Sequence, residues 1–247
     1  MPAGFRGAIF DVDGVLVDSP HEQAWREALR ELMEGPWASI RDRTTWTPDA
    51  FTGELYRERV SGRPRMGGAR AALEHFGVPD PEVRAEEYAA RKQAMIVRLI
   101  EEGEMRPFAD GVRFLRAVKD AGLRTVAASS SENAARILQG IDVGGATLLD
   151  LFDADVSGRR VAHGKPHPDL FLAAAEAVGV APAAAVVVED APAGIQAARS
   201  GGMGALAIAR AGDEALLADA GADLVVTALD HVDIAGLAAG RLATRAS

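Results

Sequence analysis

The stretch FRGAIFDVDGVLVDS, residues 5–19, decides the predicted fold of this chain. Its residues 7–10 are small and apolar, which is the pattern of a buried strand. Asp11 and Asp13 follow directly, with Gly14 behind them. In an open parallel α/β sheet, ligands collect just beyond the carboxyl ends of the strands, so both carboxylates are expected where a ligand binds.

Two carboxylates at this spacing repel each other unless a cation or a shared proton lies between them. The spacing therefore suggests a metal site, a proton-transfer role, or both. An Asx turn at the end of a strand is the structural alternative, because the short pattern D-x-D-G is also typical of such turns. An EF-hand loop is not expected, since its ligand pattern and its terminal Glu are missing.

Length and composition restrict the class of protein. The chain has 247 residues, of which 48% are hydrophobic, enough for one sizeable domain or for a domain with an insert. A net charge of −9 argues against a general nucleic-acid binder. The sequence contains neither a long apolar run nor a basic leader, and it has no cysteine, which excludes disulfides and thiolate chemistry. We therefore expect a cytoplasmic, monomeric enzyme without nucleic-acid or membrane partners.

Residues 21–102 are rich in Arg, Glu and Ala at helical spacing, and this predicts a helical insert. Residues 35–48 contain two tryptophans but no clear period, which predicts a loop. We therefore expect a core domain of residues 1–18 and 103–247 and a helical cap domain of residues 19–102. Four apolar faces indicate the helices of the insert: Trp25, Ala28, Leu29 and Leu32; Phe51, Leu55 and Tyr56; Ala72, Leu73 and Phe76, closed by Gly77; and Tyr88, Met95, Leu99 and Ile100.

From Pro107 onward, strand patterns and helix patterns alternate. This alternation predicts a doubly wound parallel sheet with helices on both faces. Ser131 is expected to cap one of the helices. The expected strands are residues 124–128, 185–188, 205–209 and 224–226, and the expected helices are residues 110–121, 131–139, 171–178 and 193–200.

Polar residues follow each of the predicted inner strands. Ser129 follows the second strand, Glu189 and Asp190 follow a later one, and Lys165 lies in a loop between them. Together with the two aspartates after the first strand, they describe a site for a divalent cation and a phosphoryl group. Each has a plain alternative as a helix cap, a solvated side chain or a helix start. Those alternatives do not explain why every one of them follows a strand.

Four segments carry a family resemblance: DVDGVLVDS from residue 11, VAASSSEN from residue 126, GKPHPDLF from residue 164 and VVVEDAPAGIQAA from residue 186. In this order they resemble the haloacid dehalogenase superfamily of phosphotransferases, subfamily I, and within it the β-phosphoglucomutase-like branch. The resemblance implies that Asp11 is a nucleophile that forms an aspartyl-phosphate, and that Asp13 is the general acid and base. Ser129 and Lys165 would hold the phosphoryl oxygens.

The resemblance also implies a Mg²⁺ site and a substrate. Asp11, the carbonyl group of Asp13, and Asp190 would bind Mg²⁺, with Glu189 among or beside the ligands. The implied substrate is a small phosphorylated sugar. Attack by a sugar hydroxyl would make the enzyme a mutase, which we favour, and attack by water would make it a phosphatase. A non-enzymatic phospho-receiver uses similar groups, but Asp13 and the helical insert argue against that class.

The resemblance extends less specifically to five further residues. His21, Arg65 and Lys92 match substrate-contacting positions of the helical domain in that branch. A capping or surface histidine, an ordinary turn before Arg65 and a solvated lysine are the respective alternatives. Ser130 and Asn133 are expected to contact the substrate phosphate or the hinge to the helical domain.

His163 and His167 flank Lys165 and raise the question of a zinc site. We expect them to be ordinary loop histidines, because no third ligand with suitable spacing is evident in the sequence.

Overall fold

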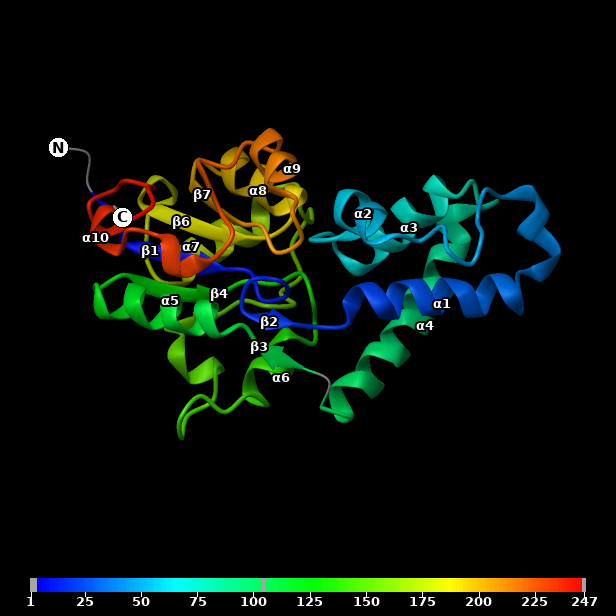
Figure 1. Cartoon of the computed structure of the whole chain (residues 1–247), viewed down its shortest axis with the longest axis horizontal. Helices are drawn as coiled ribbons and strands as arrows, with labels where there is room; N and C mark the ends of the chain where they lie inside the picture. Colours follow the sequence, from blue (N-terminus) through cyan, green and yellow to red (C-terminus); the bar gives the residue numbers. More distant parts are fainter. Residues whose placement is uncertain (1–3, 104, 246–247) are drawn as a thin grey trace. The chain divides into compact units, whose positions relative to one another are not determined.

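The computed structural model describes residues 4–103 and 105–245 and divides the chain into two compact units (Figure 1). The first, which we call the core unit, comprises Met1–Asp18 and Arg106–Ser247. The second, the helical unit, comprises Ser19–Met105. In this division the second boundary falls after Met105.

The core unit contains a six-stranded sheet in the order β5-β4-β1-β6-β7-β8, and every neighbouring pair is parallel. This confirms the predicted parallel α/β fold. The short strand β5, which pairs with β4, was not predicted. The strands are β1 (Gly7–Phe10), β4 (Arg124–Ala127), β5 (Ala154–Asp155), β6 (Ala185–Glu189), β7 (Gly204–Ile208) and β8 (Leu224–Val226).

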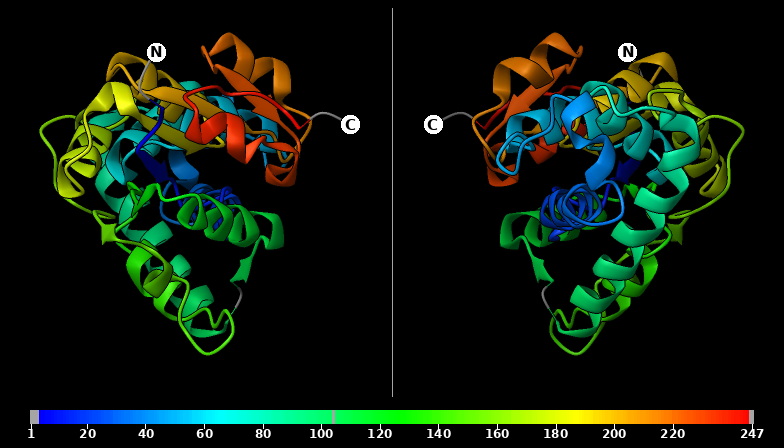
Figure 2. Two further views of the ribbon diagram at one scale, coloured as in Figure 1. Left: turned by 90° about the vertical axis from the view of Figure 1, so that its left-hand side faces the viewer. Right: turned by 90° about the vertical axis from the view of Figure 1, so that its right-hand side faces the viewer.

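Helices cover both faces of this sheet because successive side chains of a strand point to opposite faces. Ile9 packs into a cluster with Phe171 of α7 (Asp169–Ala177) and Ile195 of α8 (Pro192–Ser200). The Phe10 ring lies instead 5.9 Å from the ring of Phe114 on α5 (Ala109–Asp120). Figure 2 shows the segment around β7 and β8 in orange and the segment between β4 and β5 in green, on opposite sides of the core unit.

Two details of the core unit differ from the sequence-based expectations. The strands β2 (Val17–Asp18) and β3 (Arg106–Pro107) form an antiparallel pair that is too short to show a periodic pattern. The helix α6 (Ala134–Gln139) has its cap position at Asn133, two residues after the predicted cap, so Ser131 does not cap it. The Ser131 hydroxyl accepts the N–H of Asn133 at 3.2 Å, which makes a local turn before the helix. Two further short helices, α9 (Glu214–Asp219) and α10 (Ile234–Ala238), follow in the C-terminal part.

The described part of the helical unit contains α1 (His21–Glu34), α2 (Gly53–Leu55), α3 (Arg65–His75) and α4 (Pro81–Glu101), with a π-helical segment at Tyr56–Val60. Trp25 on α1 and Tyr88 on α4 join these helices in one core. Their rings meet edge to face at 4.9 Å, and the Tyr88 hydroxyl donates to the carbonyl of Trp25 at 2.8 Å. The buried hydroxyl is therefore satisfied, as a buried polar group requires.

The expectation of a loop at residues 35–48 was wrong in part, because Ala38–Arg43 forms a 3₁₀ helix. Trp37 and Trp46 on either side of it are buried. The Trp37 indole N–H donates to Glu87 at 2.9 Å. This segment is held by packing of its tryptophans against the helical unit and not by an amphipathic pattern of its own.

The apolar face predicted for the fourth helix was also displaced. Tyr88, Lys92 and Ile96 are buried, whereas Met95, Leu99 and Ile100 are only half-buried. The buried residues are spaced four apart and share one helix face. Because Lys92 is charged and lies in the middle of this face, a search for apolar residues at helical spacing does not detect the face.

Candidate active site

The active-site candidates Asp11 and Glu189 come together because β1 and β6 are parallel neighbours in the sheet. Phe10 of β1 pairs with Val188 of β6, and the N–H of Asp11 donates to the Val188 carbonyl at 3.0 Å. Glu189 is the last residue of β6. Both carboxylates therefore lie at the carboxyl edge of the sheet, where the sequence placed them.

Lys165 lies between these two carboxylates. Its ammonium nitrogen donates to Asp11 Oδ1 at 2.6 Å and to Glu189 Oε1 at 2.7 Å. The Lys165 and Glu189 side chains are 0% exposed and that of Asp11 is 7% exposed, so water screens these contacts little. The ammonium also lies 4.7 Å from the centre of the Phe171 ring. A solvated Lys165, the alternative considered from sequence, is excluded.

Burial sets the protonation behaviour of this pair. Loss of solvation raises the pKa of Asp11 to about 7, and the negative charges of Glu189 and Asp13 add to the rise, whereas contact with Lys165 opposes it. Burial would lower the pKa of Lys165, but the facing carboxylates of Asp11 and Glu189 raise it above its ordinary value. Lys165 is therefore a permanent cation at this edge of the sheet.

Asp190 completes a cluster of three carboxylates. Asp11, Glu189 and Asp190 each present an oxygen, and these oxygens lie within 4.8 Å of one another. Burial raises the pKa of Asp190 well above its usual value, and the charges of Glu189 and Asp11 raise it further. Only one ammonium faces these three acids among the contacts described. Hard carboxylate oxygens are the ligands that Mg²⁺ prefers, so this donor set fits a divalent cation that would favour the ionised forms.

Two glycines let the backbone approach this cluster. A methyl group on Gly194 would lie 1.6 Å from Glu189 Oε1, and one on Gly14 would lie 1.9 Å from Asp190 Oδ2. Gly14 also has a φ of +79°, which residues with side chains rarely adopt. The loop that contains Asp13 is thereby brought against Asp190.

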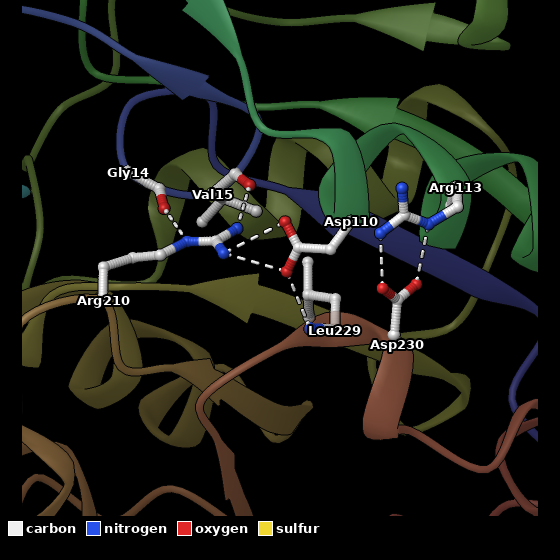
Figure 3. Close-up of polar contacts among 7 residues, drawn as sticks. All are labelled: Gly14, Val15, Asp110, Arg113, Arg210, Leu229 and Asp230. Carbon is white, nitrogen blue, oxygen red and sulfur yellow. Dashed lines mark hydrogen bonds and ion pairs between the residues drawn. The ribbon is translucent and has the colours of Figure 1, made fainter.

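Arg210, which the sequence analysis did not single out, also holds this loop, and Figure 3 shows its contacts. Its Nε donates to the carbonyl of Gly14 and its Nη2 to the carbonyl of Val15, both at 3.1 Å. Its Nη1 lies 3.0 and 2.9 Å from the two oxygens of Asp110, which also accepts the N–H of Leu229 at 2.9 Å. Arg210 comes two residues after β7, so the rule that selected the other candidates, a polar residue after a strand, would have found it.

Ser129 and its neighbours follow β4, which pairs with β1 on the side opposite β6. Ser129 is buried, and its hydroxyl accepts the N–H of Ser131 at 3.1 Å. Ser130 and Asn133 are half-buried on the same segment, and Asn133 precedes the first residue of α6. Asp13 is half-buried and its carboxylate is not part of the three-acid cluster.

The substrate-binding residues predicted in the helical unit make two contacts, one between His21 and Lys92 and one between Arg65 and Gln93. His21 is the first residue of α1 and is buried, and its Nδ1 lies 3.2 Å from the ammonium of Lys92. The Lys92 ammonium lies 5.0 Å from the Trp25 ring. Arg65 begins α3 and donates to Gln93 Oε1 at 2.6 Å. The alternatives of a surface histidine and a solvated Lys92 are thus wrong.

His163 and His167 have a third potential metal ligand near them that the sequence did not reveal. Both imidazoles face the carboxylate of Asp169, with Nδ1 distances of 3.3 Å from His163 and 2.7 Å from His167. Asp169 is the first residue of α7. The turn between the loop and α7 brings the two histidines and Asp169 together. This spacing does not match a known zinc motif, so the sequence did not indicate the third residue.

Known proteins resemble this chain in sequence and in fold. The family model of the haloacid dehalogenase-like hydrolases matches residues 5–202. The chain is 33% identical to the β-phosphoglucomutase of Mycobacterium tuberculosis over 93% of its own length and 92% of the relative. It is 32% identical to the fructose-1-phosphate phosphatase of Escherichia coli, over 82% of its own length and 95% of the relative. The chain superposes on the crystal structure of a β-phosphoglucomutase from a Pyrococcus species with a TM-score of 0.71 and 31% sequence identity. The superposition covers 94% of this chain and 96% of the Pyrococcus chain.

A doubly wound sheet with a buried lysine and three acids at its carboxyl edge offers the groups that a phosphoryl-transfer site requires. The chain belongs to the haloacid dehalogenase-like hydrolases, which generally use a divalent metal ion. It is therefore an enzyme of phosphoryl transfer, a mutase or a phosphatase, and not a phospho-receiver. Among the described residues, no helix is both long and apolar enough to cross a membrane.

Proposed function

We propose that this enzyme isomerises a small phosphorylated sugar through an aspartyl-phosphate on Asp11. The buried contact of Lys165 with both Asp11 and Glu189 is the observation that carries the proposal. A carboxylate attacks an anionic phosphate ester only when nearby cations offset the repulsion between them. The ammonium of Lys165 supplies one such cation within hydrogen-bonding distance of Asp11.

In the first step, an oxygen of Asp11 forms a bond to phosphorus while the bond from phosphorus to the sugar oxygen breaks. Asp13 gives a proton to the leaving oxygen. In the second step, Asp13 takes a proton from the incoming hydroxyl group, which attacks the phosphorus and releases the Asp11 carboxylate. Asp13 suits this role because it lies two residues from the nucleophile and outside the three-acid cluster.

The phosphoryl oxygens need cationic and hydrogen-bonding partners throughout. Lys165 and Ser129 would hold these oxygens, with Ser130 and Asn133 near the phosphate of the substrate. Asp11, Asp190 and the carbonyl group of Asp13 would hold Mg²⁺, with Glu189 beside them. A bound Mg²⁺ ion would neutralise negative charge on the transferred phosphoryl group.

Two observations favour a mutase. β-Phosphoglucomutases of Mycobacterium tuberculosis and Bacillus subtilis are each 33% identical to this chain over at least 90% of it. His21, Arg65 and Lys92 are ordered by contacts within the helical unit, which suits the substrate-binding roles that the resemblance assigns to them. A sugar phosphatase is the second candidate, because the Escherichia coli fructose-1-phosphate phosphatase is also similar over most of its length.

A panel of sugar phosphates tests this proposal, in the presence of Mg²⁺ and with or without a sugar bisphosphate activator. Formation of glucose 6-phosphate from β-glucose 1-phosphate supports the mutase. Release of inorganic phosphate without isomerisation supports the phosphatase. Turnover of neither kind on any member of the panel would overturn the assignment to sugar phosphates. We also propose that the enzyme is a monomer, which sedimentation velocity measures.

A further inference from the structure

The loop before α7 contains a second convergence of metal-ligating groups, outside the active site. His163 Nδ1 lies 3.3 Å from Asp169 Oδ2, and His167 Nδ1 lies 2.7 Å from Asp169 Oδ1. One ligand atom from each of the three side chains lies within 4.8 Å of the other two. The two imidazole rings lie close together, with centroids 4.5 Å apart and planes inclined by 41°.

The backbone holds these three side chains in place. The N–H of His163 donates to Asp169 Oδ2 at 3.0 Å, and the N–H of His167 donates to the carbonyl of Gly164 at 3.0 Å. Asp169 is further fixed because it begins a helix whose next two residues, Leu170 and Phe171, are buried in the core. Little backbone rearrangement is therefore needed to bring the ligands around an ion.

The donor set selects the kind of ion. Two imidazole nitrogens and one carboxylate oxygen suit Zn²⁺ and neighbouring transition metals, which accept nitrogen ligands readily. Mg²⁺ prefers oxygen ligands, which the three carboxylates of the active site offer, whereas two of the three ligands in this loop are nitrogens. His163 and His167 are both exposed, so water can complete the coordination of a bound ion.

We propose that His163, His167 and Asp169 form a binding site for a divalent transition-metal ion, of which Zn²⁺ is the representative. The site brackets the active-site lysine, since His163 precedes Lys165 by two residues and His167 follows it by two. A bound ion ties both ends of this short segment to the first turn of α7. The metal thereby restrains the loop that holds Lys165. The binding of the ion does not depend on the reaction proposed above.

Calorimetric titration of Zn²⁺ into the full-length, chelator-stripped protein tests this site, with Mg²⁺ in excess to occupy the carboxylate cluster. We expect one equivalent of Zn²⁺ to bind. Loss of an outer partner of a metal ligand already weakens binding by about 10–100-fold. The double substitution His163→Gln and His167→Gln should therefore weaken Zn²⁺ binding at least about tenfold. The matched substitution of an exposed histidine elsewhere in the core unit, His231→Gln, should leave it unchanged.

The substitution Asp169→Asn provides a second variant, because an Asn side-chain oxygen can still accept the N–H of His163 and preserve the turn. It should also weaken Zn²⁺ binding, while the metal-free protein still folds with the circular dichroism spectrum of the wild type. Imidazole resonances in NMR spectra supply a readout that is independent of affinity. Zn²⁺ should shift those of His163 and His167 and leave those of His75 and His231 in place. Zn²⁺ binding of equal strength in the double variant, or unmoved resonances of His163 and His167, would overturn the proposal.

Discussion

Replacing Arg210 with alanine tests whether one guanidinium group holds the loop after Asp13. The substitution removes four contacts, two to the Asp110 carboxylate and two to main-chain carbonyls of the loop. It also removes the packing of the guanidinium against the Phe108 ring, 4.0 Å away. The Asp110 carboxylate, with a side chain 12% exposed, then keeps the N–H of Leu229 but loses its cation.

The expected loss of stability follows from the burial of the ion pair between Arg210 and Asp110. Removing one partner of a buried ion pair costs about 3–5 kcal/mol. The Arg210 side chain is 21% exposed, so water can partly solvate Asp110 in the variant. We therefore expect the free energy of unfolding to fall by about 2–3 kcal/mol, at or below the lower end of that range. Four hydrogen bonds at about 0.5–1.5 kcal/mol each give a range that includes this value.

The neighbouring pair of Arg113 and Asp230, drawn beside it in Figure 3, is the matched control. It too has two contacts between a guanidinium and a carboxylate, but the side chains are 60% and 43% exposed. Exposed pairs contribute only about 0–1 kcal/mol, so Arg113→Ala should have little effect. Arg210→Lys should lie between wild type and Arg210→Ala, because one ammonium nitrogen cannot reach Asp110 and both carbonyls with the geometry of the guanidinium.

Urea unfolding followed by circular dichroism measures these free energies, and steady-state kinetics on the sugar phosphate that the substrate panel identifies measures turnover. We expect Arg210→Ala to lower kcat as well as stability, since the released loop carries Asp13 and lies against Asp190. Equal and small losses of stability for Arg210→Ala and Arg113→Ala would refute the reasoning from burial. Unchanged kcat in a folded Arg210→Ala variant would refute the link to the loop.

Further predictions concern the active site and its supports. Asp11→Asn should abolish turnover and phosphate labelling of the protein, whereas Asp13→Asn should slow the proton-dependent steps and change the pH profile of kcat; substantial turnover by Asp11→Asn would exclude the covalent route. Gly194→Ala should destabilise the protein by about 1–3 kcal/mol in urea unfolding, since the new methyl group overlaps the Glu189 carboxylate; an unchanged midpoint would contradict this. Burial alone would raise the pKa of Asp110, but hydrogen bonds from Arg210 and from the N–H groups of Leu229 and Gly111 lower it below its usual value. The stabilisation by Asp110 is therefore present above the unfolded-state pKa of about 3.9 and is lost as pH falls through the lower folded value. Asp110→Asn should reduce the fall in the free energy of unfolding at acidic pH. A fall as steep as that of wild type would show that Asp110 does not contribute to it.

The sequence by itself determined the sheet and the acids at its edge. The apolar residues 7–10 and 185–188 predict buried strands. Asp11 and Glu189 come directly after these residues, so a parallel α/β fold places both at the carboxyl edge of the sheet. These signals are local, because a strand pattern and the polar residue that ends it lie within a few positions of each other. Four short segments in a fixed order were sufficient to predict the family.

Only the tertiary structure decided which side chains meet. Lys165 contacts Glu189 across 24 positions, and Arg210 contacts Asp110 across 100. Such pairs depend on the order of the strands in the sheet and on the paths of the loops that connect them. A periodic pattern of apolar residues contains no information on either. The same reason explains the errors at residues 35–48 and in the buried face of α4, where packing against distant elements outweighed the local pattern. His163, His167 and Asp169 are near one another in sequence, but their convergence depends on the turn that leads into α7.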